Sequence, residues 1–290
     1  MNNLGKIHFQ RIIVLAALTV LYCARLAGAA DQVLPIFDTH LHYSRPAWQS
    51  IAPQDAARKL EAAGVPRALV SSSPDEGSLV LRRTDARRFA PVLRPYRNEV
   101  RSGNWTRDPK TPAYLEARLK RGIYKGIGEF HLFDEAGAGT PTVRRTAALA
   151  VRYRIVLQVH SGAAALRALF AIEPKVRILW AHAGMSEPPA VIGAMLKRHK
   201  NLWVGLSFRA GEIATGDMLD PAWRALLTRN SDRFVIGSDT YVTSRWSVYG
   251  ELIEAHRRWL KLLPAEVARA IAYGNAVRLF GSGDIKALEK

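Results

Sequence analysis

Short apolar runs rich in β-branched residues alternate along the chain with longer segments whose apolar residues recur at helical spacing. Eight of the short runs predict β-strands, at Leu34–Thr39, Ala68–Ser72, Ala90–Arg94, Tyr124–Glu129, Ile155–His160, Val176–His182, Leu202–Ser207 and Phe234–Ser238. The segments between and after them predict helices at Pro53–Ala63, Ser78–Phe89, Pro112–Arg121, Thr142–Tyr153, Ala163–Ile172, Pro189–His199, Pro221–Thr228 and Ser247–Leu263.

This order of elements predicts an α/β protein of eight βα units. Strands without strict alternation of apolar and polar residues indicate a parallel sheet covered on both faces, and eight such units close into a (β/α)8 TIM barrel. A doubly wound open sheet is the alternative, but it more commonly carries a glycine-rich turn after the first strand. This chain has His40-Leu41-His42 at that point.

One large domain accounts for the rest of the chain. The sequence has 290 residues, of which 48% are apolar and 23% charged, and no low-complexity linker divides it, so we predict a single barrel over residues 31–290. Its last element is expected to be an amphipathic helix, Pro264–Phe280, that packs on the outside of the barrel with Val267, Ile271 and Leu279 directed inward.

Residues 1–30 have the composition of a secretory signal peptide. Basic residues flank a polar opening, Ile12 to Ala24 is an apolar run, and Ala27-Gly28-Ala29-Ala30 offers small residues for cleavage. The run is too short to span a bilayer comfortably, although an uncleaved anchor is the alternative. Cys23 is the only cysteine, so the mature chain is expected to have none. We expect export to the periplasm or medium, without stable membrane anchoring after cleavage.

The net charge of +17 changes this picture only modestly. Removing the three basic residues of the leader, which has no acidic residue, leaves +14 for the mature chain. Such a field favours anionic substrates or surfaces. The basic residues are dispersed, however, and none of the basic stretches is interleaved with aromatic residues as in single-strand binders. We therefore expect a small-molecule substrate and no nucleic acid. The sequence does not fix the oligomeric state, and a homo-oligomer is one alternative because barrels of this kind often self-associate.

Histidines and acids stand where the predicted strands end. His40 and His42 share one face of a strand, because successive strand side chains alternate. Catalytic groups of this fold lie at the carboxyl ends of strands, and the remaining strand-end candidates are Glu129, His160, His182 and Asp239. Each alone also fits a structural role, such as a core histidine or a cap. Together they predict a divalent-metal site, for zinc first, with manganese, iron or cobalt as alternatives.

The same residues carry a resemblance to a known family. Phe37-Asp38-Thr39-His40-Leu41-His42, the strand-end histidines, Gly237-Ser238-Asp239 and the closing Tyr273–Phe280 together resemble the amidohydrolase superfamily, in its amidohydrolase 2 branch. The resemblance implies metal-ligand roles for His40, His42, His160, His182 and Asp239. Many relatives have a carboxylated lysine on the fourth strand, whereas Glu129 resembles the glutamate of TatD-like nucleases. Either one ion or two ions bridged by Glu129 are therefore expected.

The predicted reaction is hydrolysis of an ester, lactone or amide. A divalent ion lowers the pKa of bound water towards neutrality, which yields hydroxide to attack the substrate. Asp239 is expected to take the water's proton and return it to the leaving group. His182 or the ion is expected to stabilise the developing oxyanion.

The substrate is expected to be small and anionic. Arg94 and Arg97 follow the third predicted strand and Arg209 the seventh, so their guanidinium groups are candidates to bind a carboxylate or phosphate. Tyr241 is a candidate for an apolar wall, and surface arginines are the alternative in each case. Three other functions stay open: a TatD-like phosphoesterase or nuclease, a nonoxidative decarboxylase of the same superfamily, and a metal-binding barrel without turnover.

Overall fold

Eight parallel strands form one sheet in the computed structural model, which describes residues 33–281. Each strand pairs with the next strand of the barrel along the chain, as expected for repeated βα units. The strands are β1 (Phe37–His42), β2 (Arg67–Ser72), β3 (Phe89–Leu93), β4 (Gly126–His131), β5 (Val156–His160), β6 (Arg177–Trp180), β7 (Leu202–Gly205) and β10 (Phe234–Val235).

The first and last of these strands meet and close the ring. The amide of Thr39 donates to the carbonyl of Ile236 at 2.8 Å, and the amide of Asp239 donates to the carbonyl of His40 at 2.6 Å. Gly237 permits this approach, because a Cβ atom there would lie 2.5 Å from the Cβ of His40. The predicted (β/α)8 barrel is confirmed.

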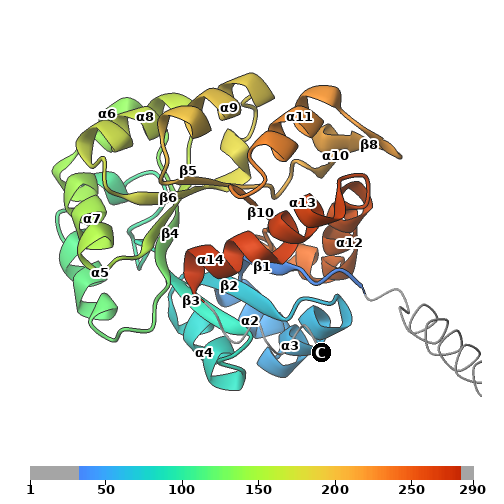
Figure 1. The fold of residues 1–290 in the computed structure, drawn as a ribbon. Helices are drawn as coiled ribbons and strands as arrows, with labels where there is room; N and C mark the ends of the chain where they lie inside the picture. Colours follow the sequence, from blue (N-terminus) through green and yellow to red (C-terminus); the bar gives the residue numbers. More distant parts are fainter. Residues whose placement is uncertain (1–32, 282–290) are drawn as a thin grey trace, which may run out of the picture. The chain divides into compact units, whose positions relative to one another are not determined.

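Helices surround the strands (Figure 1). Proline occupies the first turn of several of them, as the sequence indicated. Asp220 caps one helix by accepting the amides of Ala222 and Trp223 at 2.9 Å each. The α-helices before the last strand are α2 (Arg45–Ser50), α3 (Pro53–Ala62), α4 (Glu76–Thr84), α5 (Thr111–Leu119), α6 (Glu135–Ala138), α7 (Pro141–Arg152), α8 (Ala163–Ile172), α9 (Pro189–Arg198), α10 (Ala210–Ile213) and α11 (Pro221–Arg229).

Shorter elements lie in the loops between the main strands and helices. A two-residue hairpin, β8 (Ala214–Thr215) with β9 (Met218–Leu219), follows α10. Single 3-10 turns occupy η1 (Trp105–Arg107), η2 (Ala181–Gly184) and η3 (Thr243–Trp246). The chain then continues through α12 (Tyr249–Leu260), α13 (Ala265–Arg269), the π-helical turn η4 (Ala270–Gly274) and α14 (Asn275–Phe280).

The last helical segment closes one end of the barrel. One apolar cluster joins residues of β1, β2, β3, β5, β6 and β10 to Ala276, Val277, Leu279 and Phe280 of α14. Because β1 and β5 stand on opposite sides of the ring, a cluster that contains both lies inside it. Figure 1 shows α14 lying across the ring of strands. The expected packing on the outside of the barrel is therefore wrong for α14, whose apolar face covers the interior.

Several boundaries differ from the expected ones. The first strand begins at Phe37 and runs through His42, so both histidines lie within it. The last strand is regular only over Phe234–Val235, because the glycine and the approach to β1 take the next residues out of the ladder. The predicted signal peptide lies outside the described residues. Within the described part of the chain, no helix has the length and apolar character to cross a membrane.

Candidate metal centre

The two histidines of β1 direct the same ring nitrogen to one point. The Nε2 atoms of His40 and His42 lie 3.1 Å apart, and both side chains are buried. The opposite ring nitrogens contact hydroxyl groups: Nδ1 of His42 is 2.8 Å from Ser71 Oγ, and Nδ1 of His40 is 3.3 Å from Ser207 Oγ. Such contacts fix the rotation of each ring, so that Nε2 is presented for coordination.

Asp239 completes a first group of donors at the end of the last strand. Its Oδ1 atom lies 3.0 Å from Nε2 of His42 and 3.6 Å from Nε2 of His40. The backbone at Asp239 is left-handed, with φ of 51°, which turns the side chain back over the barrel. Oδ1 is buried and has no hydrogen-bond partner among the described residues. A buried carboxylate oxygen without a donor is costly unless a cation occupies the site.

Glu129 lies between the histidines of three strands. Its Oε1 atom is 3.0 Å from Nδ1 of His160, 3.2 Å from Nε2 of His182 and 3.4 Å from Nε2 of His40. Its Oε2 atom is 3.3 Å from Nε2 of His42. One carboxylate thus contacts all four strand-end histidines, which is the position from which it can bridge or complete a metal site.

His182 enters the cluster from an unusual turn. The backbone has positive φ at His182, Ala183, Gly184 and Met185, and a Cβ atom at Gly184 would lie 2.4 Å from the ring of Trp180. Arg209 holds this turn. Its guanidinium donates to the carbonyls of His182 at 3.2 Å and Ala183 at 3.3 Å, and also to that of Met185. Because these carbonyls belong to the turn that carries His182, Arg209 positions that ring.

The charges of the cluster stabilise one another. Burial alone would lower the pKa of His40, but the charges of Glu129 and Asp239 outweigh it and raise that pKa to about 9. Burial opposes ionisation of Asp239, yet the attraction of His40 and His42 lowers its pKa to about 2. Burial likewise opposes ionisation of Glu129, and the histidines around it hold its pKa well below the ordinary value. Both acids are therefore carboxylates that attract a cation.

The residues fit a divalent ion. Two triads have their donor atoms within 4.8 Å of one another, namely His40 with His42 and Asp239, and His40 with Glu129 and His182. The two triads share His40, and all their members are buried. Imidazole nitrogens and carboxylate oxygens are the donors that zinc and its neighbours bind in proteins. His160 contacts Glu129, but it stands outside both triads and its side chain is 26% exposed.

The predicted substrate-binding residues fall into different places. Arg94 lies beside the cluster, because its Nε donates to the carbonyl of Glu129 at 2.9 Å. Tyr241 is 60% exposed at the mouth and packs near Phe208. Arg97 is turned away and pairs with Asp108 at 2.6 Å. Arg209 is fully buried against the carbonyls described above, so the structure directs neither of these last two guanidinium groups to a substrate.

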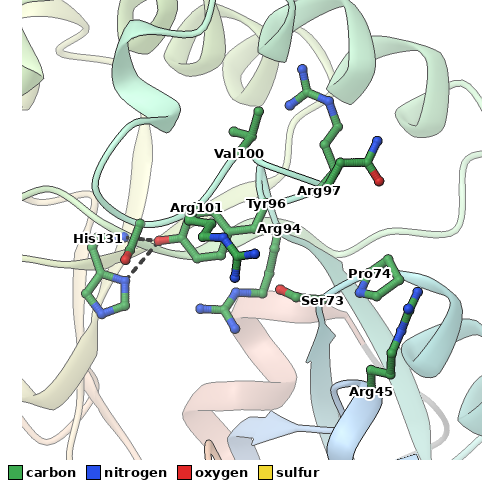
Figure 2. Close-up of a pocket in the computed structure, with 11 residues that line it drawn as sticks. Arg45, Ser73, Pro74, Arg94, Tyr96, Arg97, Val100, Arg101 and His131 are labelled. Carbon is green, nitrogen blue, oxygen red and sulfur yellow. Dashed lines mark hydrogen bonds between the residues drawn. The ribbon is translucent and has the colours of Figure 1, made fainter.

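A second feature at the mouth was not singled out from the sequence. A cavity of about 570 Å³ lies next to the cluster and is lined by residues that include Arg45, Arg94, Arg101 and His131. Figure 2 shows Arg97 extending away from the guanidinium groups of Arg94 and Arg101. Arg45 stands at the start of α2 and Arg101 in a loop far from it in sequence, and no motif signals that they line one cavity.

The fold and the buried donor cluster define a metal-dependent barrel enzyme. The sequence model of the amidohydrolase family (amidohydrolase 2) matches residues 37–282. The chain belongs to this family, as the sequence resemblance indicated. No protein among those with curated functions matches the chain at a significant level.

Solved structures with the same fold extend over most of the chain. A probable 2-pyrone-4,6-dicarboxylic acid hydrolase from Acinetobacter baumannii is 14% identical, with a TM-score of 0.60 over 86% of this chain and 100% of that chain. A TatD homologue from Escherichia coli is 16% identical, with a TM-score of 0.63 over 86% and 99%. The 5-carboxyvanillate decarboxylase from Novosphingobium aromaticivorans, complexed with manganese, is 12% identical, with a TM-score of 0.54 over 86% and 96%. At these identities the similarity is one of fold.

Proposed function

We propose that this enzyme is an exported hydrolase that uses a metal-activated water on an ester, lactone or amide bond of a small anionic substrate. The observation that carries the proposal is the unpaired Oδ1 of Asp239, buried 3.0 Å from the Nε2 atom of His42. A general base must be ionised, close to the reacting water and free of competing donors. Asp239 is ionised and buried, and its Oδ1 has no hydrogen-bond partner among the described residues. The nearby Nε2 of His42 is itself a proposed ligand of the ion, so we propose that Oδ1 faces the bound water.

The reaction divides between the ion and the side chains. The residues of the two triads would hold a divalent ion, which would supply Lewis acidity and lower the pKa of water to about 7. Asp239 would accept a proton from the water at Oδ1 and return it to the leaving group. Its pKa of about 2 means that it holds this proton only if its surroundings change during turnover. His182, whose Nε2 lies 3.2 Å from Oε1 of Glu129, or the ion itself would stabilise the oxygen that gains charge, because Nε2 cannot both bind the ion and donate a hydrogen bond.

We propose zinc as the ion, because four imidazoles and two carboxylates converge at strand ends. The shared His40 leaves two arrangements: one ion held by the triads together, or two ions bridged by Glu129. Metal analysis of purified protein separates them. Glu129→Gln is expected to lower the content from two ions to about one if Glu129 bridges, and to leave one ion in place if it does not. A protein that retains no ion after supplementation would overturn the proposal.

Turnover is tested on a panel of lactones, esters and amides, each with and without a carboxylate. Incorporation of ¹⁸O from labelled water into the product is expected for hydrolysis. Release of carbon dioxide without ¹⁸O incorporation would replace hydrolysis by decarboxylation, and cleavage of phosphodiesters would favour the nuclease alternative. Nucleic-acid binding is not expected. If phosphodiesters are cleaved, the affinity for single-stranded DNA should fall steeply with salt.

Export is supported by the composition of residues 1–30. Expression of the full chain followed by fractionation and N-terminal sequencing tests it. We expect a shortened protein in the periplasm or the medium, with cleavage after the small residues near Ala30. A full-length protein retained in the membrane fraction would instead support the uncleaved anchor.

A further inference from the structure

The cavity beside the metal centre has the composition of an anion site. Four arginines and no acidic residue line its volume of about 570 Å³. Like charges that gather without opposite charges repel one another, so the arrangement gains stability only if something neutralises it. Arg97 is neutralised by Asp108. Arg94 has one carboxylate, that of Glu129, at 3.8 Å. Among residues 33–281, the guanidinium groups of Arg45 and Arg101 have no acidic partner.

Two of these arginines have no partner for their side chains in the part of the chain that the structure describes. Among residues 33–281, no hydrogen bond or ion pair engages the guanidinium of Arg45 or that of Arg101. Arg45 begins α2, which follows the strand that carries His40 and His42, and Arg101 lies in the loop after β3. Both are exposed. A helix start and a separate loop therefore bring positive charge without an ion-pair partner among the described residues to one cavity at the mouth.

Arg94 links this cavity to the metal centre. Its Nε atom donates to the carbonyl of Glu129, and its second terminal nitrogen lies 3.8 Å from Oε2 of the same residue. Its guanidinium also stacks on the ring of Tyr96, 4.5 Å from the centroid. A molecule that reacts at the metal centre and extends past Arg94 would thus place its far end between Arg45 and Arg101.

The wall of the cavity is held in place. The hydroxyl of Tyr96 accepts the backbone amide of His131 at 2.7 Å and lies 2.9 Å from its Nδ1 atom. Figure 2 shows these two contacts at the edge of the cavity. His131 also stacks on His160, with ring centroids 4.4 Å apart. A rigid wall reduces the entropy lost when a ligand binds, which suits a site that fixes one end of a substrate.

We propose that Arg45, Arg94 and Arg101 form a subsite for an oxyanion, a carboxylate or a phosphate, at the end of the substrate remote from the bond that is broken. This inference rests on the proposed function, because it assumes that the substrate reacts at the metal centre. Guanidinium groups bind both oxyanions through paired hydrogen bonds. Arg97 and Arg209, the other arginine candidates from the sequence, are not part of the subsite.

Binding of non-reactive probes to the metal-loaded protein tests the subsite. Isophthalate supplies carboxylates, phenylphosphonate supplies a phosphate-like group, and isophthalamide is the neutral analogue of the first. Calorimetric titration at low and high salt should show binding of at least one anion, weakened by salt, and no binding of the amide. The stronger of the two anions identifies the oxyanion that the subsite prefers. Equal affinity for isophthalate and isophthalamide would overturn the proposal, as would failure of both anions to bind at millimolar concentrations.

Variants locate that binding. Arg45→Gln and Arg101→Gln are each expected to weaken the anion roughly tenfold, and the double variant roughly a hundredfold. Arg83→Gln is the matched control, because Arg83 is an exposed arginine near the end of α4, which leads into the start of β3 at the other end of the barrel. Metal content and melting temperature should be unchanged in all of them, since neither cavity arginine is buried. Wild-type affinity in the double variant would overturn the subsite.

The outcome is separable from that of the proposed function. Binding is read without turnover, so loss of anion affinity in the double variant supports the subsite even if no hydrolysis is found. Hydrolysis of a substrate whose KM is the same in wild type and double variant would leave the proposed function standing and would overturn the subsite.

Discussion

The carboxylate of Asp38 accepts two hydrogen bonds from Ser238, one from its amide at 3.0 Å and one from its hydroxyl at 2.6 Å. These residues stand at the two ends of the barrel sequence, on β1 and directly after β10. The same carboxylate accepts the amide of His40 at 3.0 Å and the hydroxyl of Tyr249 at 3.0 Å. Asp38 therefore ties together the neighbours of two predicted metal ligands, His40 and Asp239.

Removal of Asp38 should loosen both the fold and the metal site. We expect Asp38→Ala to lower the free energy of unfolding by roughly 3 kcal/mol, because several buried donors lose their acceptor. Asp38→Asn, which keeps the shape, should be less destabilising but should still reduce metal affinity. Urea unfolding and metal titration measure the two effects. Ser238→Ala serves as the control that removes only one of the bonds, and unchanged metal affinity in Asp38→Asn would contradict the positioning role.

Arg209 should behave as a structural residue. We expect Arg209→Met to lower the free energy of unfolding by roughly 3 kcal/mol, because the carbonyls of the His182 turn lose a buried donor. The melting temperature and the metal content should fall together. Arg209→Lys should not rescue it, since one ammonium cannot reach several carbonyls. The control is Glu212→Gln, whose side chain is 53% exposed and should matter little. A raised KM with an unchanged melting temperature would instead indicate a substrate contact.

Asp239→Asn tests the general base. The amide keeps the shape of the side chain but cannot accept a proton, so we expect kcat to fall roughly a hundredfold or more while the fold is retained. Circular dichroism and metal analysis should accompany the kinetics, because loss of the ion alone would also remove activity. A kcat near that of the wild type would contradict the role of Asp239 as the general base.

His256 should make the fold sensitive to acid. Burial lowers its pKa to about 4, while the backbone carbonyl of Gly237 opposes this shift. The unfolded chain takes up this proton near pH 6.5, so the contribution of the neutral ring is complete above that value. It is lost as the pH falls towards 4. A shift of this size corresponds to roughly 3 kcal/mol.

His256→Gln isolates that contribution. Nε2 of His256 lies 3.2 Å from the carbonyl oxygen of Gly237, and Nε1 of Trp259 donates to its Nδ1 at 3.2 Å. Glutamine can make both hydrogen bonds, but it does not titrate in this range. Stability measured by urea at pH values between 4 and 7 should therefore fall less steeply in the variant than in the wild type. Parallel curves would show that another group accounts for the loss.

The barrel was predictable because its signals are local. Each strand is a short apolar run, and β1, β4, β5, β6 and β10 end in or near a predicted metal ligand. Sequence order alone therefore assembles His40, His42, Glu129, His182 and Asp239. The hydrogen bonds that orient these side chains were not predictable in the same way. Ser71 of the neighbouring strand β2 and Ser207 after β7 orient the histidines of β1 although they lie far from them in sequence, and nothing in their immediate sequence marks them.

Arginine is the residue type for which sequence reasoning was weakest. A long side chain can face substrate, solvent or the interior, and its neighbours in sequence do not determine which. Arg97 and Arg209 follow strands just as Arg94 does, yet one pairs with Asp108 and the other is buried in a turn. Arg45 and Arg101 line one cavity at the mouth because the start of α2 and the loop after β3 lie on the same side of the closed ring.

The segment that closes the barrel has a consequence for synthesis. The inner face of β1 is among the first parts of the described chain to be made, whereas the residues of α14 that cover it are made after all eight strands. Until then the apolar interior around Phe37 is open to water at that end. A chain that stops before Asn275 would contain every predicted metal ligand but would lack α14, which packs against the interior side of β1. We therefore expect His40 and His42, the first ligands to be synthesised, to reach their final positions only after the last helix has been made.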